Sequence, residues 1–186
     1  MSDIVTVGSG EFALSLRLPE TGMPEILALD RPPVVADPLF EIERSSRING
    51  MDIAVPSAVL LPSGGMGFFG WPAIAGHRAG RDIILAFSGW SAARDGAQTV
   101  LSASDPVARI GIAITLTDHA SGVLSIATRL SNAGDSDYQL DRCMAASFLA
   151  PSGETTITSF TGSWGREFQT RRETLGNGLW MQENRR

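Results

Sequence analysis

The chain has 186 residues, of which 43% are hydrophobic and 19% are charged, so a single globular domain with a sizeable apolar core is expected. Its formal net charge of −5 argues against a nucleic-acid partner, which would need a basic surface. Its one cysteine, Cys143, excludes an internal disulfide framework and fits a reducing compartment, so we expect a cytoplasmic location. No apolar run approaches the roughly 18–20 residues of a membrane span, and the first residues lack the features of a secretory leader. We therefore expect neither a membrane partner nor secretion.

The first half of the chain alternates short apolar runs with turns that are rich in Gly and Pro. Within residues 3–18, which we predict to be strands, every second residue of the second part is apolar: Phe12, Leu14, Leu16 and Leu18. Residues 25–29, 55–61 and 82–88 predict three further strands. Residues 62–72 read as a loop of glycines and aromatics, and residues 91–98 give a weak indication of a helical turn.

The clearest hairpin lies in the second half of the chain. Ile110, Ile112, Ile114 and Leu116 alternate with small or polar residues, and a turn at residues 118–122 leads into a matching strand at residues 124–130. Further strands are expected at residues 98–101, 138–149, 155–161 and 179–183. No long segment with helical periodicity alternates with these strands, so the sequence predicts an all-β fold, an antiparallel β-sandwich.

The residues that usually carry chemistry are scattered. His77 and His119 lack the spacing of metal ligands and Cys143 lies in a strand-like run, so neither a metal site nor a cofactor is expected. The sequence contains no nucleophile elbow, P-loop or dinucleotide-binding glycine motif. Most carboxylates lie in turns or near strand ends, and their spacing picks out no pair suited to glycoside hydrolysis. We therefore assign no catalytic residue to this chain.

Two stretches combine glycines with aromatic residues that could be exposed or packed in a core. The first is the loop at residues 62–72, with Phe68, Phe69 and Trp71, and it fits either a binding surface or a loop folded over a small core. The second is the stretch at residues 159–167, with Trp164, Arg166 and Glu167. It fits either a shaped contact surface or a turn with a core tryptophan and a surface ion pair.

Four motifs along the chain resemble the N-terminal domain of glycoside hydrolase family 36 α-galactosidases. They are Leu-Ser-Asn-Ala-Gly-Asp at residues 130–135, Tyr-Gln-Leu-Asp-Arg at 138–142, Phe-Thr-Gly-Ser-Trp-Gly-Arg-Glu at 160–167 and Glu-Asn-Arg-Arg at 183–186. Residues 21–27 and 60–73 resemble two earlier segments of the family more loosely. The resemblance thus covers most of the chain, and its motifs are specific in combination rather than singly.

The resemblance implies a β-supersandwich of the galactose-mutarotase type that precedes a (β/α)8 barrel. Residues 1–186 would then form an incomplete N-terminal domain, and both catalytic Asp residues would belong to the barrel, outside this chain. Such enzymes hydrolyse terminal α-galactosides, such as melibiose and raffinose, with retention. The implied partners are the remainder of the parent enzyme, α-galactoside sugars and further copies of the chain. The implied roles of this domain are barrel packing, oligomerisation and a contribution to a neighbouring active site.

The chain departs from the family in the glycine-rich loop. Many members carry an Asp and an Arg there that reach sugar in a neighbouring subunit, whereas this chain has Phe68 and Gly70 at those positions. A stacking surface made by Trp71, Phe69 and Phe68 is therefore the candidate sugar contact. By the same resemblance, Trp164, Arg166 and Glu167 are candidates for domain packing.

Two alternatives remain open at this point. A free-standing carbohydrate-binding sandwich would bind sugar without chemistry. A mutarotase-like enzyme would need a His and a Glu facing one sugar ring, for which His77 and His119 are the available histidines. An incomplete sandwich would leave strand edges and an apolar face uncovered, so we expect this chain to self-associate.

Overall fold

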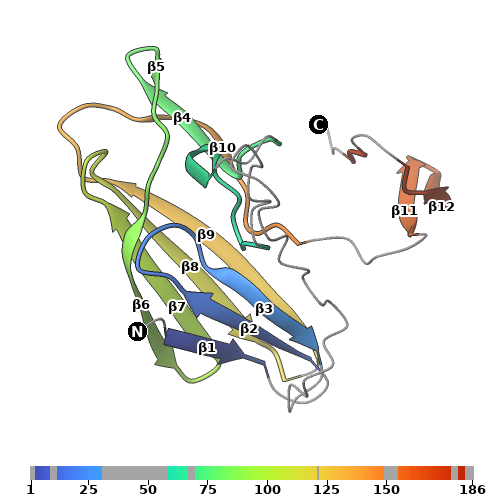
Figure 1. Cartoon of the computed structure of the whole chain (residues 1–186). Helices are drawn as coiled ribbons and strands as arrows, with labels where there is room; N and C mark the ends of the chain where they lie inside the picture. Colours follow the sequence, from blue (N-terminus) through green and yellow to red (C-terminus); the bar gives the residue numbers. More distant parts are fainter. Residues whose placement is uncertain are drawn as a thin grey trace, which may run out of the picture. The chain divides into compact units, whose positions relative to one another are not determined.

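The computed structural model describes residues 3–8, 12–30, 58–66, 70–120, 122–148, 155–176 and 180–182. The chain divides into two compact units, Met1–Phe148 (unit 1) and Leu149–Arg186 (unit 2). Among the described residues, the 3₁₀ turn η1 (Gly64–Met66) is the only helical element, which confirms the all-β prediction. Figure 1 shows the strands of both units.

Unit 1 contains three antiparallel sheets. The first has the order β1-β2-β3, with β1 (Asp3–Val7), β2 (Ala13–Leu18) and β3 (Glu25–Asp30). The second has the order β6-β7-β8-β9, with β6 (Ser88–Asp95), β7 (Gln98–Asp105), β8 (Ile110–Asp118) and β9 (Leu124–Asn132). The third has the order β10-β4-β5, with β4 (Ile74–Arg78), β5 (Arg81–Asp82) and β10 (Gln139–Cys143).

The core of unit 1 lies between the first two sheets, which form the two layers of a sandwich (Figure 1). Leu14 and Leu16 of β2 are fully buried, as are Ile114 and Leu116 of β8. In β8 the residues between them are only partly buried, so the period-two pattern predicted the buried face of that strand correctly. In β2 the half-buried pattern was wrong, because Ala13 and Ser15 on its opposite face are buried as well. Packing of the two sheets is thus what stabilises this unit.

The expected hairpin at residues 110–130 is confirmed as β8 and β9. Their register pairs Ile114 with Thr128 and runs without a bulge from Ile110 to Asp118. The preceding strand β7 is longer than the predicted residues 98–101 and pairs with β8 over its whole length. The helical turn expected at residues 91–98 is wrong, because these residues form β6 and a two-residue turn at Gly96 and Ala97.

The strand predicted at residues 82–88 is largely replaced by irregular backbone. Only Asp82 and Ser88 belong to strands, whereas the residues between them run extended without a ladder. The Asp105 carboxylate accepts the Ala86 N–H at 2.8 Å. Two backbone hydrogen bonds hold the ends of the segment, from the Ile83 N–H to the Gly76 carbonyl oxygen and from the Gly22 N–H to the Phe87 carbonyl oxygen. Leu85 and Phe87 are buried while Ile84 is 68% exposed, so alternation is kept without a neighbouring strand.

Other strand boundaries also differ from the prediction. Of residues 55–61, those up to 57 lie outside the described residues, and Val59 makes only an isolated bridge to Glu25. The run predicted at 138–149 ends as a strand at Cys143, and residues 180–182 are not in a strand. Three strands were not predicted, β4, β6 and β12 (Arg166–Thr174), because none shows clean apolar alternation.

Unit 2 is a two-stranded antiparallel ribbon. Its strands are β11 (Thr156–Ser163), near the predicted position, and β12. The register shifts between Thr161 and Ser163, where Gly162 faces the β12 backbone: a Cβ on Gly162 would lie 2.8 Å from the Arg166 carbonyl oxygen. This close approach explains why the Phe-Thr-Gly segment needs a glycine at that position.

A second glycine marks the contact between β4 and β10. A Cβ on Gly76 would lie 2.5 Å from the Gln139 carbonyl oxygen and 2.5 Å from the Tyr138 ring. The hydroxyl end of the Tyr138 side chain therefore packs against β4 at a position that has no side chain. The Arg78 guanidinium lies over the same ring, 5.9 Å from its centroid.

We predict that Gly76→Ala lowers the free energy of unfolding by about 1–3 kcal/mol, because the added methyl group overpacks the Tyr138 contact. Chemical denaturation followed by circular dichroism measures this change. Gly64→Ala is the matched control, since a Cβ there meets nothing within 4 Å. Equal stabilities for the two variants would contradict the assignment.

Candidate functional site

The loop that begins at residue 62 is closed at its base by backbone hydrogen bonds. The Ala73 N–H donates to the Pro62 carbonyl oxygen at 2.7 Å, and the Met144 N–H donates to the Ala73 carbonyl oxygen at 2.8 Å. Phe68 and Phe69, two of the candidate sugar contacts, lie outside the described residues. The third, Trp71, is 58% exposed. The loop thus presents an aromatic ring at the surface of unit 1 from a fixed base.

Arg142 fixes the position of Trp71. Its guanidinium carbon lies 4.5 Å from the centroid of the indole ring, and its Nη1 donates to the Pro72 carbonyl oxygen at 3.4 Å. Arg142 ends the Tyr-Gln-Leu-Asp-Arg motif on β10, so this motif holds the loop through a cation–π contact. More than half of the Trp71 surface still remains available for stacking.

The turn motif at residues 130–135 is organised by one amide side chain. The Asn132 Oδ1 atom accepts the Gly134 N–H at 3.0 Å and an Arg78 Nη2–H at 2.6 Å, while its Nδ2 donates to the Ser136 carbonyl oxygen at 2.8 Å. A Cβ on Gly134 would lie 2.4 Å from Arg78 Nη2. The motif therefore needs both an Asn and a Gly to bind the arginine of β4.

Asp135, the last residue of the turn motif, forms an exposed ion pair. Its carboxylate accepts Arg109 Nη1–H at 2.6 Å, although its side chain is 91% exposed. Such an exposed pair contributes little to stability. Its role is to link the turn after β9 to the turn before β8.

Tyr138 lies in an environment that disfavours its charged form. Burial raises the pKa of the Tyr138 phenol above its usual 10.0, the Asp141 carboxylate raises it further, and the Arg78 guanidinium opposes both. A phenol held neutral against a glycine and an arginine is a packing residue. Both ends of the motif at residues 138–142 thus have packing roles: Tyr138 packs on Gly76 and Arg142 contacts Trp71.

The two histidines have separate, local partners. His77 Nδ1 accepts the Gly80 N–H at 3.2 Å, and its Nε2 lies 4.0 Å from Asp141 Oδ1. His119 Nε2 is 2.7 Å from the Ser125 hydroxyl within its own turn. Neither contact is a His–Glu pair of the kind that mutarotase chemistry requires.

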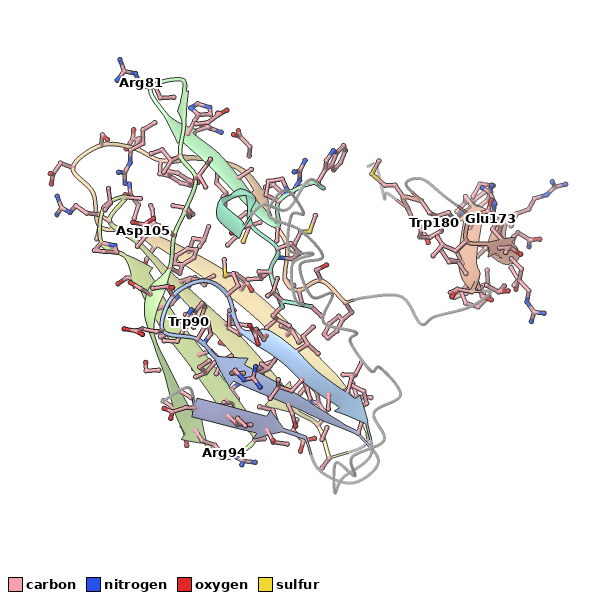
Figure 2. All side chains as sticks on the ribbon, viewed as in Figure 1. Arg81, Trp90, Arg94, Asp105, Glu173 and Trp180 are labelled. Atoms are coloured by element: carbon pink, nitrogen blue, oxygen red, sulfur yellow. The ribbon has the colours of Figure 1, made fainter. Side chains whose placement is uncertain are left out.

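Asp105, an acidic side chain that lines a groove of unit 1, has a structural role. The groove has a volume of about 1080 Å³ and is also lined by Arg78, Asp82, Phe87 and Val107 among others. Asp105 is 4% exposed, and its carboxylate accepts the N–H groups of Ala86, Val107 and Ala108 at 2.8–2.9 Å. Asp105 is the last residue of β7 and is labelled in Figure 2.

The described residues contain neither a cluster of metal-binding side chains nor a long apolar helix. They contain no group of three or more His, Cys, Asp and Glu side chains that could hold a metal ion. No helix in this part of the chain is long and apolar enough to cross a membrane. Cys143 is an exposed residue and forms no disulfide. Partial burial of its thiol raises the pKa above the usual 9.0.

The candidate packing residues lie together at the turn of the unit 2 ribbon. Trp164 is 98% exposed at the tip, and the Glu167 Oε1 atom accepts the Gly165 N–H at 2.8 Å. Arg166 begins β12 beside them and is also exposed. The ribbon carries two more exposed aromatics, Phe160 and Phe168, whose rings meet edge to face at 6.3 Å.

The structure thus brings Trp164, Arg166 and Glu167 together but buries none of them within unit 2. A two-stranded ribbon has no second layer that could cover aromatic side chains. The interpretation of Trp164 as a core residue of its own turn does not hold for this unit. A role in contacting another surface stays a prediction.

Residues after β12 fold back onto the ribbon, which the sequence did not indicate. The Trp180 Nε1–H donates to Glu173 Oε2 at 2.9 Å, and Arg171 Nη2 donates to Glu173 Oε1 at 2.7 Å (Figure 2). The Gln182 side-chain amide donates to the Phe160 carbonyl oxygen at 3.2 Å. The hydrogen bond from Trp180 lowers the pKa of the Glu173 carboxyl below its usual 4.5, and Arg171 lowers it further.

The chain is similar in sequence to proteins of known family. The model of the glycosyl hydrolase family 36 N-terminal domain matches residues 36–186. A curated relative, alpha-galactosidase from Escherichia coli, is 29% identical over 150 residues, which are 81% of this chain and 21% of that protein. The chain therefore spans about a fifth of the length of that relative.

Solved structures share the fold. The alpha-galactosidase from Lactobacillus brevis aligns with a TM-score of 0.73 at 16% identity, covering 94% of this chain and 28% of that one. The family 36 alpha-galactosidase AgaA from Geobacillus stearothermophilus aligns with a TM-score of 0.75 at 15% identity, covering 95% and 28%. A variant of AgaA, solved in complex with raffinose, aligns with a TM-score of 0.70 at 17% identity.

We predict that the Trp180 contact is sensitive to acid. Because the pKa of Glu173 is lowered by this contact, the contact is complete above the usual carboxyl pKa of 4.5 and is lost as the pH falls through the lower value in the folded chain. The NMR resonance of the Trp180 indole N–H should shift in that acidic range. Glu173→Gln keeps an oxygen acceptor without a charge, so a pH-independent resonance in this variant is the control. A resonance that moves equally in both proteins would refute the contact.

Proposed function

Because the chain belongs to the glycosyl hydrolase family 36 N-terminal domain family, we propose that it is the non-catalytic N-terminal domain of an α-galactosidase that hydrolyses terminal α-galactosides with retention. The observation that carries the proposal is the family match over residues 36–186. A curated relative and solved structures that are named alpha-galactosidases support it. Each of them is several times longer than this chain.

The proposal assigns the chemistry to a (β/α)8 barrel outside this chain. Retaining hydrolysis uses two carboxyl groups about 5–5.5 Å apart, one as nucleophile and one as acid and base. Among the described residues, Asp105 is the only buried acid. Its carboxylate is occupied by three backbone N–H groups, which makes it unsuitable for either role.

In this proposal the unit 2 ribbon packs on the remainder of the enzyme. Trp164 and Phe168 are 98% and 82% exposed, and aromatic side chains of this size each bury about 150–250 Å² when they are covered. Arg166 and Glu167 flank the turn and would orient the contact through polar interactions. Docking would supply the second layer that the ribbon lacks.

The loop that carries Trp71 would contribute to the substrate pocket of a neighbouring copy in a homo-oligomer. The C–H faces of a galactosyl ring pack on aromatic rings and exclude water, and Trp71 offers such a ring. Phe68 and Phe69 precede it in the same loop. The exposed thiol of Cys143 supports a cytoplasmic location for the assembly, since it would stay reduced there.

We predict that chain 1–186 alone releases no chromophore from a nitrophenyl α-galactoside, whereas the longer product of its reading frame does. The physical reason is that the two carboxyl groups come from the barrel. Sequencing the reading frame downstream checks the premise, since a barrel with two catalytic Asp residues should follow. Cleavage by chain 1–186 alone, or a stop codon directly after its last codon, would contradict the proposal.

One observation favours a second candidate, a free-standing carbohydrate-binding sandwich without catalysis. Trp71 is largely exposed and is held rigidly by Arg142, so it presents a preformed stacking surface. This function would need no barrel. It differs from the main proposal in requiring affinity for sugar in the chain itself.

The second candidate predicts measurable heat when chain 1–186 is titrated with melibiose. Trp71→Ala should abolish this heat, because it removes the aromatic ring on which the sugar would stack. Trp164→Ala, which also removes an exposed indole, is the control and should retain it. Absence of heat in the unsubstituted chain at millimolar sugar would exclude this candidate and leave the main proposal intact.

A further inference from the structure

A β-bulge interrupts the pairing of β10 with β4. Leu140 pairs with Gly76 of β4. Arg142, two residues later, pairs with the adjacent Ala75, which leaves Asp141 as an extra residue on β10. Paired residues of neighbouring strands direct their side chains to the same face of a sheet, and successive residues alternate between faces. The bulge therefore places Leu140 and Arg142 on opposite faces, although residues two apart in a regular strand share one.

The bulge directs the Arg142 side chain to the loop that carries Trp71. The guanidinium carbon lies 4.5 Å from the centroid of the indole ring, and Nη1 donates to the Pro72 carbonyl oxygen at 3.4 Å. In an unbulged strand, Arg142 would share the face of Leu140, opposite to the face from which it now contacts the ring. Bulges often re-aim a side chain next to a functional site.

The guanidinium covers one face of the Trp71 ring. A cation within about 6 Å of the centroid is attracted by the electron-rich face of the ring, so the contact favours one orientation of the indole. Trp71 is nevertheless 58% exposed, so the arginine orients the ring without enclosing it. A sugar that stacks on Trp71 must therefore use the face that the guanidinium leaves open.

We infer that Arg142 is a positioning residue for sugar binding and that it acts through Trp71. This role rests on the proposed function, in which the loop with Trp71 contributes to a substrate pocket. A ring that is already held in its binding orientation loses less side-chain freedom when the sugar stacks on it, so the sugar binds more tightly. Loss of Arg142 should therefore raise KM and leave kcat unchanged, because it weakens the ground state and the transition state equally.

The test measures the steady-state kinetics of the longer product of the reading frame with a nitrophenyl α-galactoside. Arg142→Met keeps an apolar stem but removes the charge and the N–H donors, so we expect KM to rise by about two- to tenfold. Arg142→Lys keeps a cation that can lie over the ring and should recover part of this loss. Arg109→Met removes an exposed arginine that pairs with Asp135, and this matched control should leave both constants unchanged.

A double variant separates positioning from a general packing role. Because Arg142 acts through Trp71, Arg142→Met should cause no further increase in KM when it is added to Trp71→Ala. A loss of folded enzyme would instead lower kcat in proportion to the inactive protein and would leave KM unchanged.

The outcomes separate this role of Arg142 from the function on which it rests. An inactive longer product would overturn the proposed hydrolysis and the role of Arg142 together. An active product in which Trp71→Ala leaves KM unchanged would overturn the contribution of the loop to the pocket, and with it the role of Arg142. If Trp71→Ala raises KM, three results would overturn the positioning role alone: an unchanged KM in Arg142→Met, additive effects in the double variant, or an Arg142→Lys variant no better than Arg142→Met.

Discussion

Burial of one face of each sheet is the constraint on which unit 1 depends. Leu14 and Leu16 of β2 and Ile114 and Leu116 of β8 are fully buried. The alternate residues of β8 are only partly buried, so a slip of one residue would turn its apolar side chains away from the core. The turn that Asn132 organises directly follows β9 of the same sheet, whereas Tyr138 packs on Gly76 of the third sheet.

The described residues of unit 2 contain no second sheet layer. Its ribbon buries little beyond Ser159, and its aromatics at 160, 164 and 168 remain exposed. Local interactions replace a core: an edge-to-face ring pair, the turn hydrogen bond of Glu167 and the return of Trp180 onto Glu173. These interactions organise the ribbon without covering it, so its exposed aromatic side chains remain available for contact with another surface.

The sequence predicted the sheets where a single rule decided the outcome. The alternation from Ile110 to Leu116 indicated β8 and its buried face, because one face of this strand meets the core. It did not predict β4, where Gly76 makes room for the Tyr138 ring from another strand. It misread residues 83–87, which are held by the distant carboxylate of Asp105. Contacts between residues far apart in sequence decide such segments, and local periodicity does not record them.

The motifs indicated the family but not the tasks of their residues. Asn132 and Gly134 shape a turn around Arg78, Arg142 supports Trp71, and Gly162 admits the backbone of β12.

The hydrogen bonds of Asp105 limit where insertions and deletions can be tolerated during evolution. One carboxylate binds amides at 86, 107 and 108, so the spacing of these segments in space is fixed while the β6–β7 tip at Gly96 lies outside that tether. Inserted or deleted residues should accumulate at the tip during evolution and be purged near the tether.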